Sequence, residues 1–555
     1  MSAAMPSTAW QQYPAASTSR PAPLSQNPRL RLLVHPLTAI CAVQAALSLS
    51  LVWSNTAYID EADYVWLGHL EIAHWLHGTS WPSAYAEKLF SGSPIIYPPL
   101  GALADNIGGL AGARILSLTF MIGATVLLYL TAFRLIGRRG AIFSAALWAL
   151  SEPAIRLAFA TFDPLSVLLT ALSAWFIVQA GFRHRSGTFM IAAAASLALA
   201  NATAYSGIVI DPVVIAFAFL TRQPGSWTRK VAAYTACFVG GTAVFFGLLM
   251  TVAHSFAGLL FTVIERNVAD YQSPTPILSD IWNYSGIIMS LAIIGSIVAC
   301  NMEILSRAAL LVLLGSAAFI VPVAQLHDQT GWSLDKHLAY GIWFATITAG
   351  YGCDQLIHRS PRANRQFASI CCIIGIIYIA ATSWQSAWDR FHAWPNADAF
   401  ISHFKIAAAQ SHGLIYVPGQ EANIAQYYTA QGRDLKRWSA ALSFDPGGSQ
   451  SRLESYYTTQ LRHTDYGLIA LFYSTTFASA PELPEEFLLS QHDSGANGGL
   501  LGLGENAEEP GLQELTLALE KDRDYYPIDH GSTIGPYNSA SDNGIYVIWL
   551  KKPEK

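Results

Sequence analysis

The chain has 555 residues, of which 52% are hydrophobic and only 12% are charged, and its mean hydropathy is +0.32. Because soluble globular proteins carry about 25% charged residues, this composition excludes an ordinary soluble enzyme and indicates a chain that uses the bilayer as its solvent. The net charge of −5 is small, so nucleic acid is not an expected partner.

The first stretch, residues 1–28, is rich in Ala, Ser, Pro and Gln and is expected to be a disordered cytoplasmic tail. The apolar run 32–53 follows Arg29 and Arg31. It is too long for the apolar core of a signal peptide and opens a series of further apolar runs. We therefore interpret it as the first membrane helix.

A helix needs about 20 apolar residues to cross the hydrocarbon core of a bilayer. About eleven segments meet or nearly meet this requirement: 32–53, 112–136, 140–160, 162–181, 188–205, 207–221, 231–253, 284–301, 307–325, 337–355 and 367–384. The fifth and sixth are short, so re-entrant or broken helices are alternatives there. The sequence predicts a mainly α, polytopic membrane domain over residues 29–384.

Basic residues gather in alternate connections between these segments, which predicts the orientation of the chain. The connections with most positive charge hold Arg29, Arg31, Arg138, Arg139, Arg183, Arg185, Arg222, Arg229, Lys230, Arg307, Arg359, Arg362 and Arg365. The other set holds only Lys88, Arg156, Arg266 and Lys336. The first set is expected to be cytoplasmic, which places the N-terminus inside and the C-terminus outside.

Two long segments are then extracytoplasmic: the loop 54–111 and the C-terminal region 385–555. The latter has strand-like runs at 413–417, 466–472 and 544–550, with helix-like stretches near 421–431, 451–461 and 483–490. This alternation predicts a small α/β domain. The Gly-rich stretch 493–512 is expected to be a loop. No cysteine lies after residue 384, so a disulfide framework is excluded, and no catalytic motif is visible.

The loop 54–111 carries the first candidate site. Its stretch 58–78 has the apolar period of a helix and is expected to lie along the membrane interface, with Asp60 and Glu61 at its start. Adjacent carboxylates beside the membrane surface suit acid/base chemistry. The alternative is structural: Asp60 with Asp63 also fits a helix N-cap with an acidic third position, and Glu61 then favours the helix dipole.

Asp163 is the second candidate, on the outer side between the third and fourth segments. A carboxylate among apolar helices is costly and is by default a functional candidate. Since Pro164 follows it, the alternative is an N-cap with Pro at the first helical position.

The third group of candidate site residues is cationic. Asp335, Lys336 and His337 begin the tenth segment on the outer face, where Lys336 and His337 suit a lipid-linked phosphate. The alternative is ordinary interfacial anchoring of a helix end. Further candidates for phosphate contacts are Lys88, Arg114 and Arg266.

In their order and topological side, these features resemble the C-type membrane glycosyltransferases that use polyprenyl-phosphate sugars, a group with the protein O-mannosyltransferases and the aminoarabinose transferases. The resemblance covers most of residues 30–385. It is carried by residues 60–64 (DEADY), 97–100 (YPPL), 112–117 (GARILS), 162–164 (FDP) and 335–338 (DKHL). Relatives carry a lysine where this chain has residues 91–93 (SGS), and often another where it has 204–206 (AYS).

The resemblance implies inverting transfer of a sugar from a polyprenyl-phosphate donor to a glycan, lipid or protein acceptor at the outer face of the membrane. It implies that Asp60 acts as base, beside Glu61, and that Asp163 is the second acid. Lys336, His337 and Arg114 then stabilise the departing phosphate. A divalent cation, Mg²⁺ or Mn²⁺, held by Asp60, Glu61 and Asp163 remains an open alternative.

Two other functions stay open. A lipid-linked substrate transporter or flippase would be favoured by charges buried within spans, and Asp211 in the sixth segment is the main such residue. A non-catalytic scaffold for cell-envelope assembly would tolerate replacement of the first-loop carboxylates. In each case we expect a multi-pass protein of a bacterial inner membrane.

Overall fold

The computed structural model describes residues 36–552, except 83–85, 87–89, 183–185, 222–228, 263–271, 332, 360, 392–395, 418–420, 430–434, 439–449, 475–511 and 534–543. The chain divides into two compact units. The helical unit comprises the described residues of Met1–Val52, Ser83–Tyr97 and Arg114–Ala387. The mixed unit comprises those of Trp53–Pro82, Pro98–Ala113 and Trp388–Lys555.

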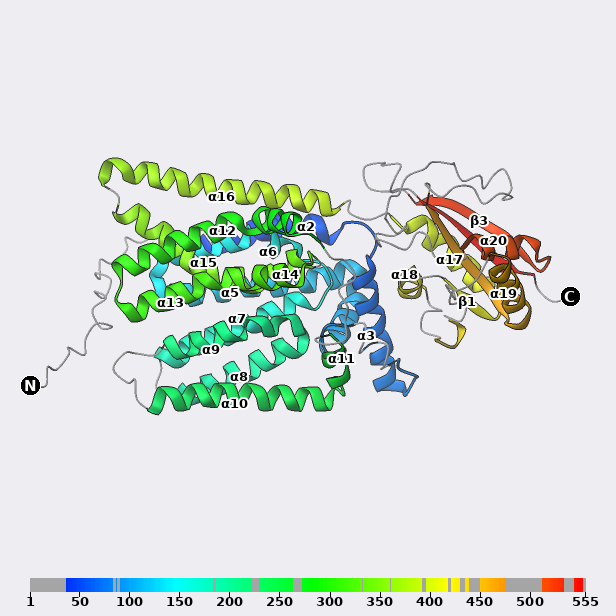
Figure 1. Ribbon diagram of the computed structural model, residues 1–555, viewed down its shortest axis with the longest axis horizontal. Helices are drawn as coiled ribbons and strands as arrows, with labels where there is room; N and C mark the ends of the chain where they lie inside the picture. Colours follow the sequence, from blue (N-terminus) through cyan, green and yellow to red (C-terminus); the bar gives the residue numbers. More distant parts are fainter. Residues whose placement is uncertain are drawn as a thin grey trace, which may run out of the picture. The chain divides into compact units, whose positions relative to one another are not determined.

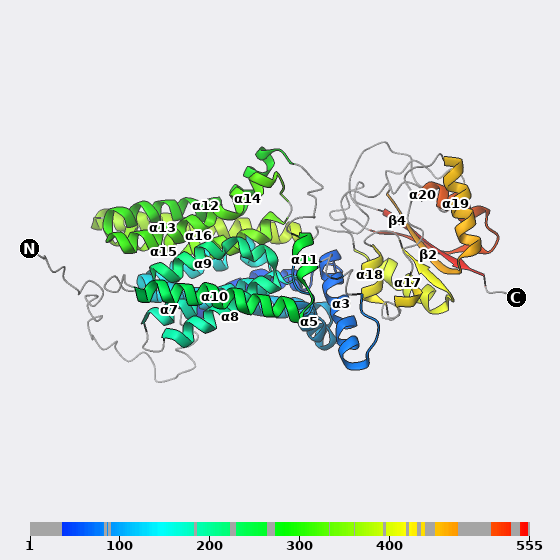
Figure 2. The ribbon, with the colours of Figure 1, turned by 60° about the horizontal axis from the view of Figure 1, so that its bottom comes forward.

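The helical unit is a bundle of long helices that run beside one another (Figures 1 and 2). In chain order, its long and short helices are α2 (Pro36–Val52), α5 (Tyr97–Ala149), α6 (Glu152–Arg156), α7 (Asp163–Phe182), α8 (Ser186–Thr203), η1 (Tyr205–Ile210), α9 (Asp211–Leu220), α10 (Arg229–Val252), α11 (Phe256–Leu260), α12 (Pro274–Met302), α13 (Leu305–Ser316), η4 (Ala317–Phe319), α14 (Ile320–Asp328), α15 (Leu334–Arg359) and α16 (Arg362–Phe391).

Six helices in the described ranges are long and apolar enough to cross a membrane, and three shorter apolar helices accompany them. The predicted multi-pass, mainly α architecture is confirmed. The count of eleven crossings stays a prediction.

Two of the predicted segments differ in detail from the helices observed. Gly137 has a φ of +85° inside α5, so the chain turns there between the second and third predicted segments. The third segment was expected to run to residue 160, but α5 ends at Ala149 and the short α6 follows. In the sixth segment, the 3₁₀ helix η1 runs directly into α9 at Asp211, and the alternative of a broken or re-entrant helix stays a prediction.

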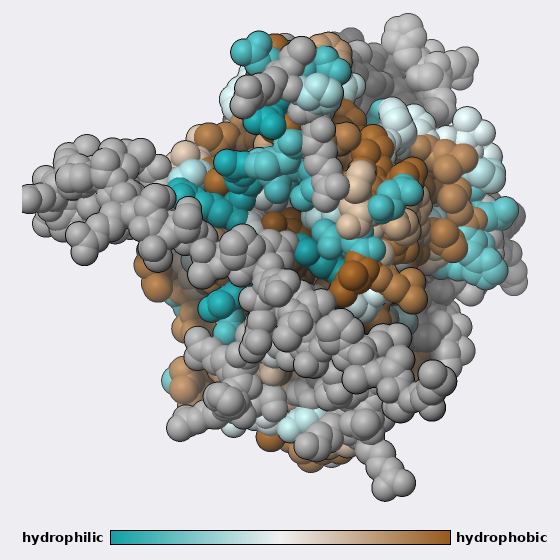
Figure 3. Space-filling model, turned by 90° about the vertical axis from the view of Figure 1, so that its left-hand side faces the viewer, coloured by the Kyte–Doolittle hydropathy of each residue, from teal (hydrophilic) through white to brown (hydrophobic). Residues whose placement is uncertain are grey.

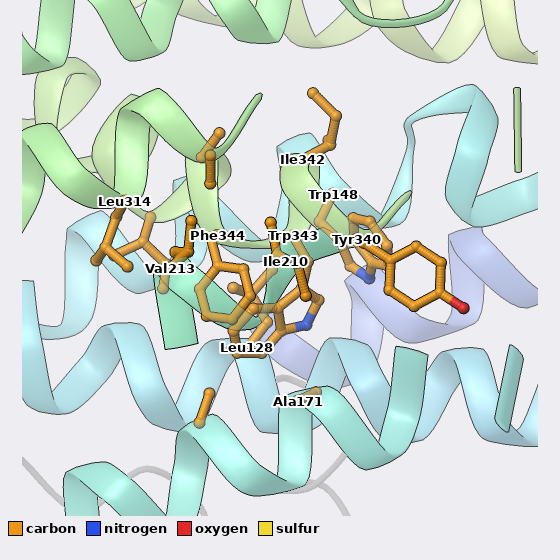
Figure 4. Packing of buried hydrophobic residues seen from close by; sticks show 14 of the residues in the cluster. Leu128, Trp148, Ala171, Ile210, Val213, Leu314, Tyr340, Ile342, Trp343 and Phe344 are labelled. Atoms are coloured by element: carbon orange, nitrogen blue, oxygen red, sulfur yellow. The ribbon is translucent and has the colours of Figure 1, made fainter. Parts of the chain in front are cut away.

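The core of the helical unit is built around α15 (Figure 4). Trp343 donates its indole N–H to the carbonyl of Ala124 at 3.0 Å, which anchors α15 to α5. Its ring packs edge-on against Phe344 with centroids 4.9 Å apart, and Phe344 contacts Phe217 of α9 in the same manner. Tyr340 lies one turn before Trp343 and is 1% exposed. This packing fixes the first turns of α15, which carry the candidate cations.

The flanks of the bundle are apolar. Along α16, Ile370, Ile373, Ile374 and Ile377 are all more than half exposed, as expected for side chains that face lipid. Figure 3 views one end of the helical unit and shows hydrophilic side chains gathered near its centre, with hydrophobic ones around the sides.

The mixed unit contains a four-stranded sheet in the order β1-β2-β4-β3. The strands are β1 (Leu414–Tyr416), β2 (Tyr466–Ser474), β3 (Tyr525–Thr533) and β4 (Gly544–Lys551), with β1 parallel to β2 and the other pairs antiparallel. The helices are α3 (Ile59–His77), α17 (Asp398–Gln410), α18 (Glu421–Tyr428), η6 (Leu435–Arg437), α19 (Gln450–His463) and α20 (Leu512–Lys521).

Alternating residues of β2 fill the two faces of this sheet. Leu468, Ala470 and Phe472 belong to the core under α17 and α18, whereas Ile469 and Leu471 belong to the core under α19 and α20. The predicted α/β domain is confirmed in its three expected strands. β3, α17 and α20 were not predicted, and the expected helix 483–490 lies outside the described residues, with nearly all of the loop 493–512.

The helix α3 of the first outer loop packs within the mixed unit. Ala57 and Ala62, at its start, share the core of α17 and α18. Further along, a Cβ at Gly68 would lie 2.0 Å from the carbonyl oxygen of Pro98, so only glycine permits this approach of α3 to α5. The acid-bearing helix and the C-terminal α/β domain therefore belong to one compact body.

Candidate active site

Asp163 is fully buried at the start of α7 and is not the cap of that helix. The amide of Ser166 donates to the carbonyl of Phe162 at 3.2 Å, which is the first turn of α7 and makes Phe162 the N-cap. The N-cap alternative for Asp163 is therefore wrong. The carboxylate accepts a long hydrogen bond of 3.4 Å from the Thr161 hydroxyl. Its burial has to be explained by another charge.

That charge is Lys336. Its Nζ lies 4.0 Å from Asp163 Oδ2, and both side chains are nearly inaccessible, with 9% and 0% of their surface exposed. The neighbouring Asp335 instead pairs with Arg156, at 2.5 Å between Oδ2 and Nε. The structure thus joins the second predicted acid to a predicted phosphate-binding cation.

Two helix N-termini meet beside this pair, those of α7 and α15. Ser333, the residue before α15, has a φ of +58°, and its carbonyl accepts the amide of His337 at 3.0 Å. Asp335 Oδ1 accepts the amide of Lys336 at 2.7 Å. The partial positive charge at such helix starts favours anions nearby. The setting suits a phosphate group.

Tyr340 adds a hydroxyl one turn after Lys336. Its ring lies against Gly207 of η1, where a Cβ would come within 3.3 Å of the ring and 3.2 Å of the Ser166 hydroxyl. Figure 4 shows the Tyr340 hydroxyl directed away from the aromatic core. The sequence analysis did not single out Tyr340, because an isolated tyrosine in an apolar span carries no signal.

The other predicted cations lie in different surroundings. Arg114 is 1% exposed, donates from Nη1 to the carbonyls of Leu51 and Val52 at 3.4 Å each, and lies over the Phe159 ring at 5.4 Å. It therefore caps the C-terminus of α2. His337 is half-buried beside Lys336. Lys88 and Arg266 lie outside the described residues.

The two stretches that lack the relatives' lysines contact each other. The amide of Tyr205 donates to the carbonyl of Ser91, and the amide of Ser93 donates to that of Ala202, both at 2.7 Å. A Cβ at Gly92 would lie 2.0 Å from the carbonyl oxygen of Thr203, so glycine is required there. Small residues at 91–93 permit this close backbone packing.

Asp211, the residue that favoured a transporter, begins α9 rather than standing alone inside a span. Its Oδ2 accepts a hydrogen bond of 2.7 Å from Asn201. Asp211 is half-buried, and only Oδ2 of its carboxylate has this local partner, while Oδ1 has no hydrogen-bond partner among the described residues.

The first-loop carboxylates lie in the mixed unit, in the first turn of α3. Tyr58 is the N-cap and makes no side-chain cap hydrogen bond, so the alternative of Asp60 as N-cap is wrong. Glu61 is fully buried and Asp60 partly exposed. Both carboxylates interact favourably with the dipole of α3, as expected for acids in the first turn of a helix.

Two further acids of α3, Asp63 and Glu71, are 2% and 1% exposed. With about 100° per residue, Asp60, Asp63 and Glu71 fall within an arc of about 80° on one face of the helix. Burial, and then the nearby Asp60 charge, raise the pKa of Asp63 well above its usual range. Burial raises the pKa of Glu71 to about 8. These acids carry no sequence signal beyond their helical spacing.

Asp105 joins α3 to the C-terminal domain. Its Oδ2 lies 2.7 Å from Nε2 of His69 in α3, and its Oδ1 accepts the hydroxyl of Tyr427 of α18 at 2.6 Å. The sequence analysis missed this cluster because its members are far apart in the chain.

A divalent cation needs a cage of several oxygen ligands. Within the described ranges, no three side chains of His, Cys, Asp or Glu gather in a way that would hold a metal ion. Asp163 has an ammonium group beside it, which opposes a second cation there. Asp163, with Lys336 beside it, does not fit a metal cage.

Comparisons with known proteins agree with this architecture. Residues 102–250, from α5 to α10, match the family model of dolichyl-phosphate-mannose-protein mannosyltransferases. ArnT from Cupriavidus metallidurans, bound to undecaprenyl phosphate, is 14% identical and has a TM-score of 0.55, with 92% of this chain and 97% of that chain covered. The chain has the C-type glycosyltransferase fold.

Structures of an archaeal oligosaccharyltransferase share this glycosyltransferase fold. AglB from Archaeoglobus fulgidus, with an inhibitory peptide and a dolichol-phosphate, is 12% identical at a TM-score of 0.50, covering 80% of this chain and 70% of that chain. The oligosaccharyltransferase of the same organism with Zn and sulfate is 11% identical at 0.50, covering 80% and 68%. No curated protein matches the chain.

Proposed function

We propose that this protein transfers a sugar from a polyprenyl-phosphate donor to an acceptor hydroxyl at the outer face of the membrane. The observation that carries the proposal is the buried Asp163–Lys336 pair, 4.0 Å apart at the starts of α7 and α15 in a C-type glycosyltransferase fold. A buried acid–cation pair at helix N-termini suits the anionic end of a lipid carrier.

The relatives indicate the class of donor. One structure with this fold holds undecaprenyl phosphate and another holds a dolichol-phosphate. We assign binding of the same kind of phosphate to the helical unit, through Lys336 and His337. Asp163 holds the ammonium of Lys336 in place. The polyprenyl chain lies along the apolar flanks of the bundle, where long hydrocarbon is favoured.

The reaction we propose is an inverting displacement. The acceptor hydroxyl oxygen forms a bond to the anomeric carbon, while the bond from that carbon to the phosphate oxygen breaks. Asp60, beside Glu61, accepts the proton of the hydroxyl. The electron pair of the broken bond stays on the polyprenyl phosphate, whose increased negative charge is stabilised by Lys336 and His337. The acceptor is a glycan, a lipid or a protein, and the sugar a hexose or a pentose.

The charges around the C-terminal end of α15 support a site at the outer face of the membrane. At its C-terminal end, His358 contacts Arg139 and Asp354, and Arg365 donates to the His358 carbonyl at 3.2 Å. Two of the basic connections predicted to be cytoplasmic thus meet there. Lys336 is at the opposite end of this 26-residue helix, which is about 39 Å long at 1.5 Å per residue. A cytoplasmic C-terminal end of α15 supports our proposal that the site faces the outer side of a bacterial inner membrane.

The test is transfer from a panel of radiolabelled polyprenyl-phosphate sugars by the purified protein in detergent. We expect wild type to consume one donor and Asp60→Asn to lose about 10²-fold or more of that activity while it stays folded. Asp398→Asn, an exposed acid in the first turn of α17, is the matched control and should retain it. If wild type neither consumes nor binds any donor, the proposed function is wrong. If Asp60→Asn is fully active, the base must be sought at Glu61 or Asp163.

A further inference from the structure

We propose that the C-terminal α/β domain positions the acid-bearing helix α3 through a bridge of three side chains, His69, Asp105 and Tyr427. The inference rests on the proposed function in so far as α3 carries Asp60 and Glu61. It assigns a role to the C-terminal domain and to three positioning residues.

Asp105 is the centre of the bridge because it uses both carboxylate oxygens, each toward a different helix. Oδ2 is hydrogen-bonded to Nε2 of His69 in α3 at 2.7 Å. Oδ1 accepts a hydrogen bond from the Tyr427 hydroxyl of α18 at 2.6 Å. The His69 and Asp105 side chains are only 12% and 14% exposed. Bonds to a charged acceptor in a largely dry setting are stronger than neutral ones, so the three segments are held together.

Tyr427 is well suited to a fixed donor role. Burial, and then the Asp105 charge, raise the pKa of its hydroxyl, so the proton stays on the phenol oxygen throughout the physiological range. The charge of Glu61 contributes to the same shift, which places the catalytic pair within electrostatic reach of the bridge. A displacement of α18 therefore changes the surroundings of Glu61 as well as the position of α3.

A second set of contacts holds the chain just before α3. The amide of Ala57 donates to the Tyr428 hydroxyl oxygen at 2.7 Å, and the amide of Ala397 donates to Thr56 Oγ1 at 3.2 Å. The rings of Tyr427 and Tyr428 pack with centroids 4.5 Å apart. The C-terminal domain thus contacts α3 at its N-terminal approach and, through Asp105, near its middle.

These contacts matter because no side-chain cap hydrogen bond is made at the N-terminus of α3, where Asp60 and Glu61 lie. Most of the stability of a helix in a protein comes from the packing of its apolar face rather than from intrinsic propensity. The direction of α3, and with it the position of Asp60, therefore depends on what it packs against. A misplacement of about 1 Å at a reacting group is enough to cost about 10² in rate.

The experiment compares Tyr427→Phe with Tyr525→Phe in the full-length protein. Tyr525 donates its hydroxyl to the Tyr466 carbonyl at 2.8 Å in the core under α19 and α20, so its loss removes a buried hydroxyl on the other face of the sheet. Each variant is examined by hydrogen–deuterium exchange of the peptide 59–77 and by donor kinetics. Asp105→Asn, which keeps the shape of the carboxylate, is compared with Asp105→Ala.

We expect Tyr427→Phe to increase exchange across 59–77 and to lower kcat by about tenfold while the donor KM changes less than about twofold. Tyr525→Phe should do neither, and Asp105→Asn should be less impaired than Asp105→Ala. Unchanged exchange in Tyr427→Phe, equal effects of the two tyrosine variants, or increased exchange with unchanged kcat would each overturn the proposal. If wild type uses no polyprenyl-phosphate donor, the proposed function fails, and the exchange comparison still decides whether the domain holds α3.

Discussion

Lys336 Nζ and Asp163 Oδ2 lie 4.0 Å apart at the first turns of two helices that are distant in the chain. The pair is almost fully buried, so each charge depends on the other in a setting with little water. Removing one member of a buried pair destabilises a protein by more than the pair's net contribution to its stability. The reason is that the remaining charge is left buried without a partner.

Asp163→Asn should lower turnover by about 10²-fold or more, since the ammonium of Lys336 loses the carboxylate that holds it in place. The measurement is donor consumption by purified protein of confirmed monodispersity. Asp328→Asn changes an exposed acid at the end of α14 and should remain as active as wild type. Full activity in Asp163→Asn would show that the pair is structural only.

Lys336→Gln should raise the donor KM by about tenfold or more, because a charge-assisted contact to phosphate contributes about 1.5–3 kcal/mol. Lys336→Arg keeps the positive charge and should lose less. The check is a titration with an unreactive polyprenyl phosphate, which lacks the sugar and reports binding alone. Equal affinity in wild type and Lys336→Gln would exclude Lys336 from the phosphate site.

Arg114→Ala should destabilise the protein rather than weaken donor binding selectively. Its guanidinium is buried, caps the end of α2 and lies over Phe159, so truncation removes hydrogen bonds and packing together. We expect the thermal midpoint to fall by several degrees. Arg134→Ala, at an exposed position of α5, should not change it.

A contrary result for Arg114 is informative. If Arg114→Ala keeps the wild-type thermal midpoint and raises only the donor KM, the phosphate-binding role predicted from the sequence is correct. The cap on α2 would then be dispensable.

Glu71→Gln should flatten the pH dependence of stability. The folded carboxyl has a pKa of about 8, above its ordinary value of 4.5, so the folded state binds the proton more tightly between these values. The stabilisation is therefore complete below the ordinary value and is lost as pH rises through the folded one. Wild type should unfold at a lower temperature at about pH 8 than at about pH 5, and the glutamine variant should show a smaller difference.

The control for this experiment is Asp524→Asn, which replaces an exposed acid of the mixed unit. Its pH profile should follow that of wild type. A Glu71→Gln profile that also follows wild type would show that another group governs the transition.

Hydropathy and charge made much of the fold predictable. Long apolar runs report helices in lipid directly, because every backbone group must be satisfied within the segment. Short continuous apolar runs likewise predicted β1, β2 and β4 in the C-terminal domain. β3 was missed because its sequence, YYPIDHGST, contains a proline, a glycine and an aspartate that oppose strand formation.

The candidate acids were also visible in the sequence, but their partners were not. Asp335 and Lys336 are neighbours, yet one pairs with Arg156 and the other with Asp163. Successive residues on a helix point about 100° apart, so the rotation and packing of α15 decide which partner each side chain meets.

The sequence by itself therefore determined that this is a multi-pass membrane protein with acidic and basic candidate residues at the predicted outer face. Those conclusions depend on local composition and period. Only the tertiary structure decided that Asp163 is paired with Lys336, that Arg114 caps α2, and that Asp105 joins α3 to the C-terminal domain. Each of these depends on contacts between segments distant in the chain, which no local pattern encodes.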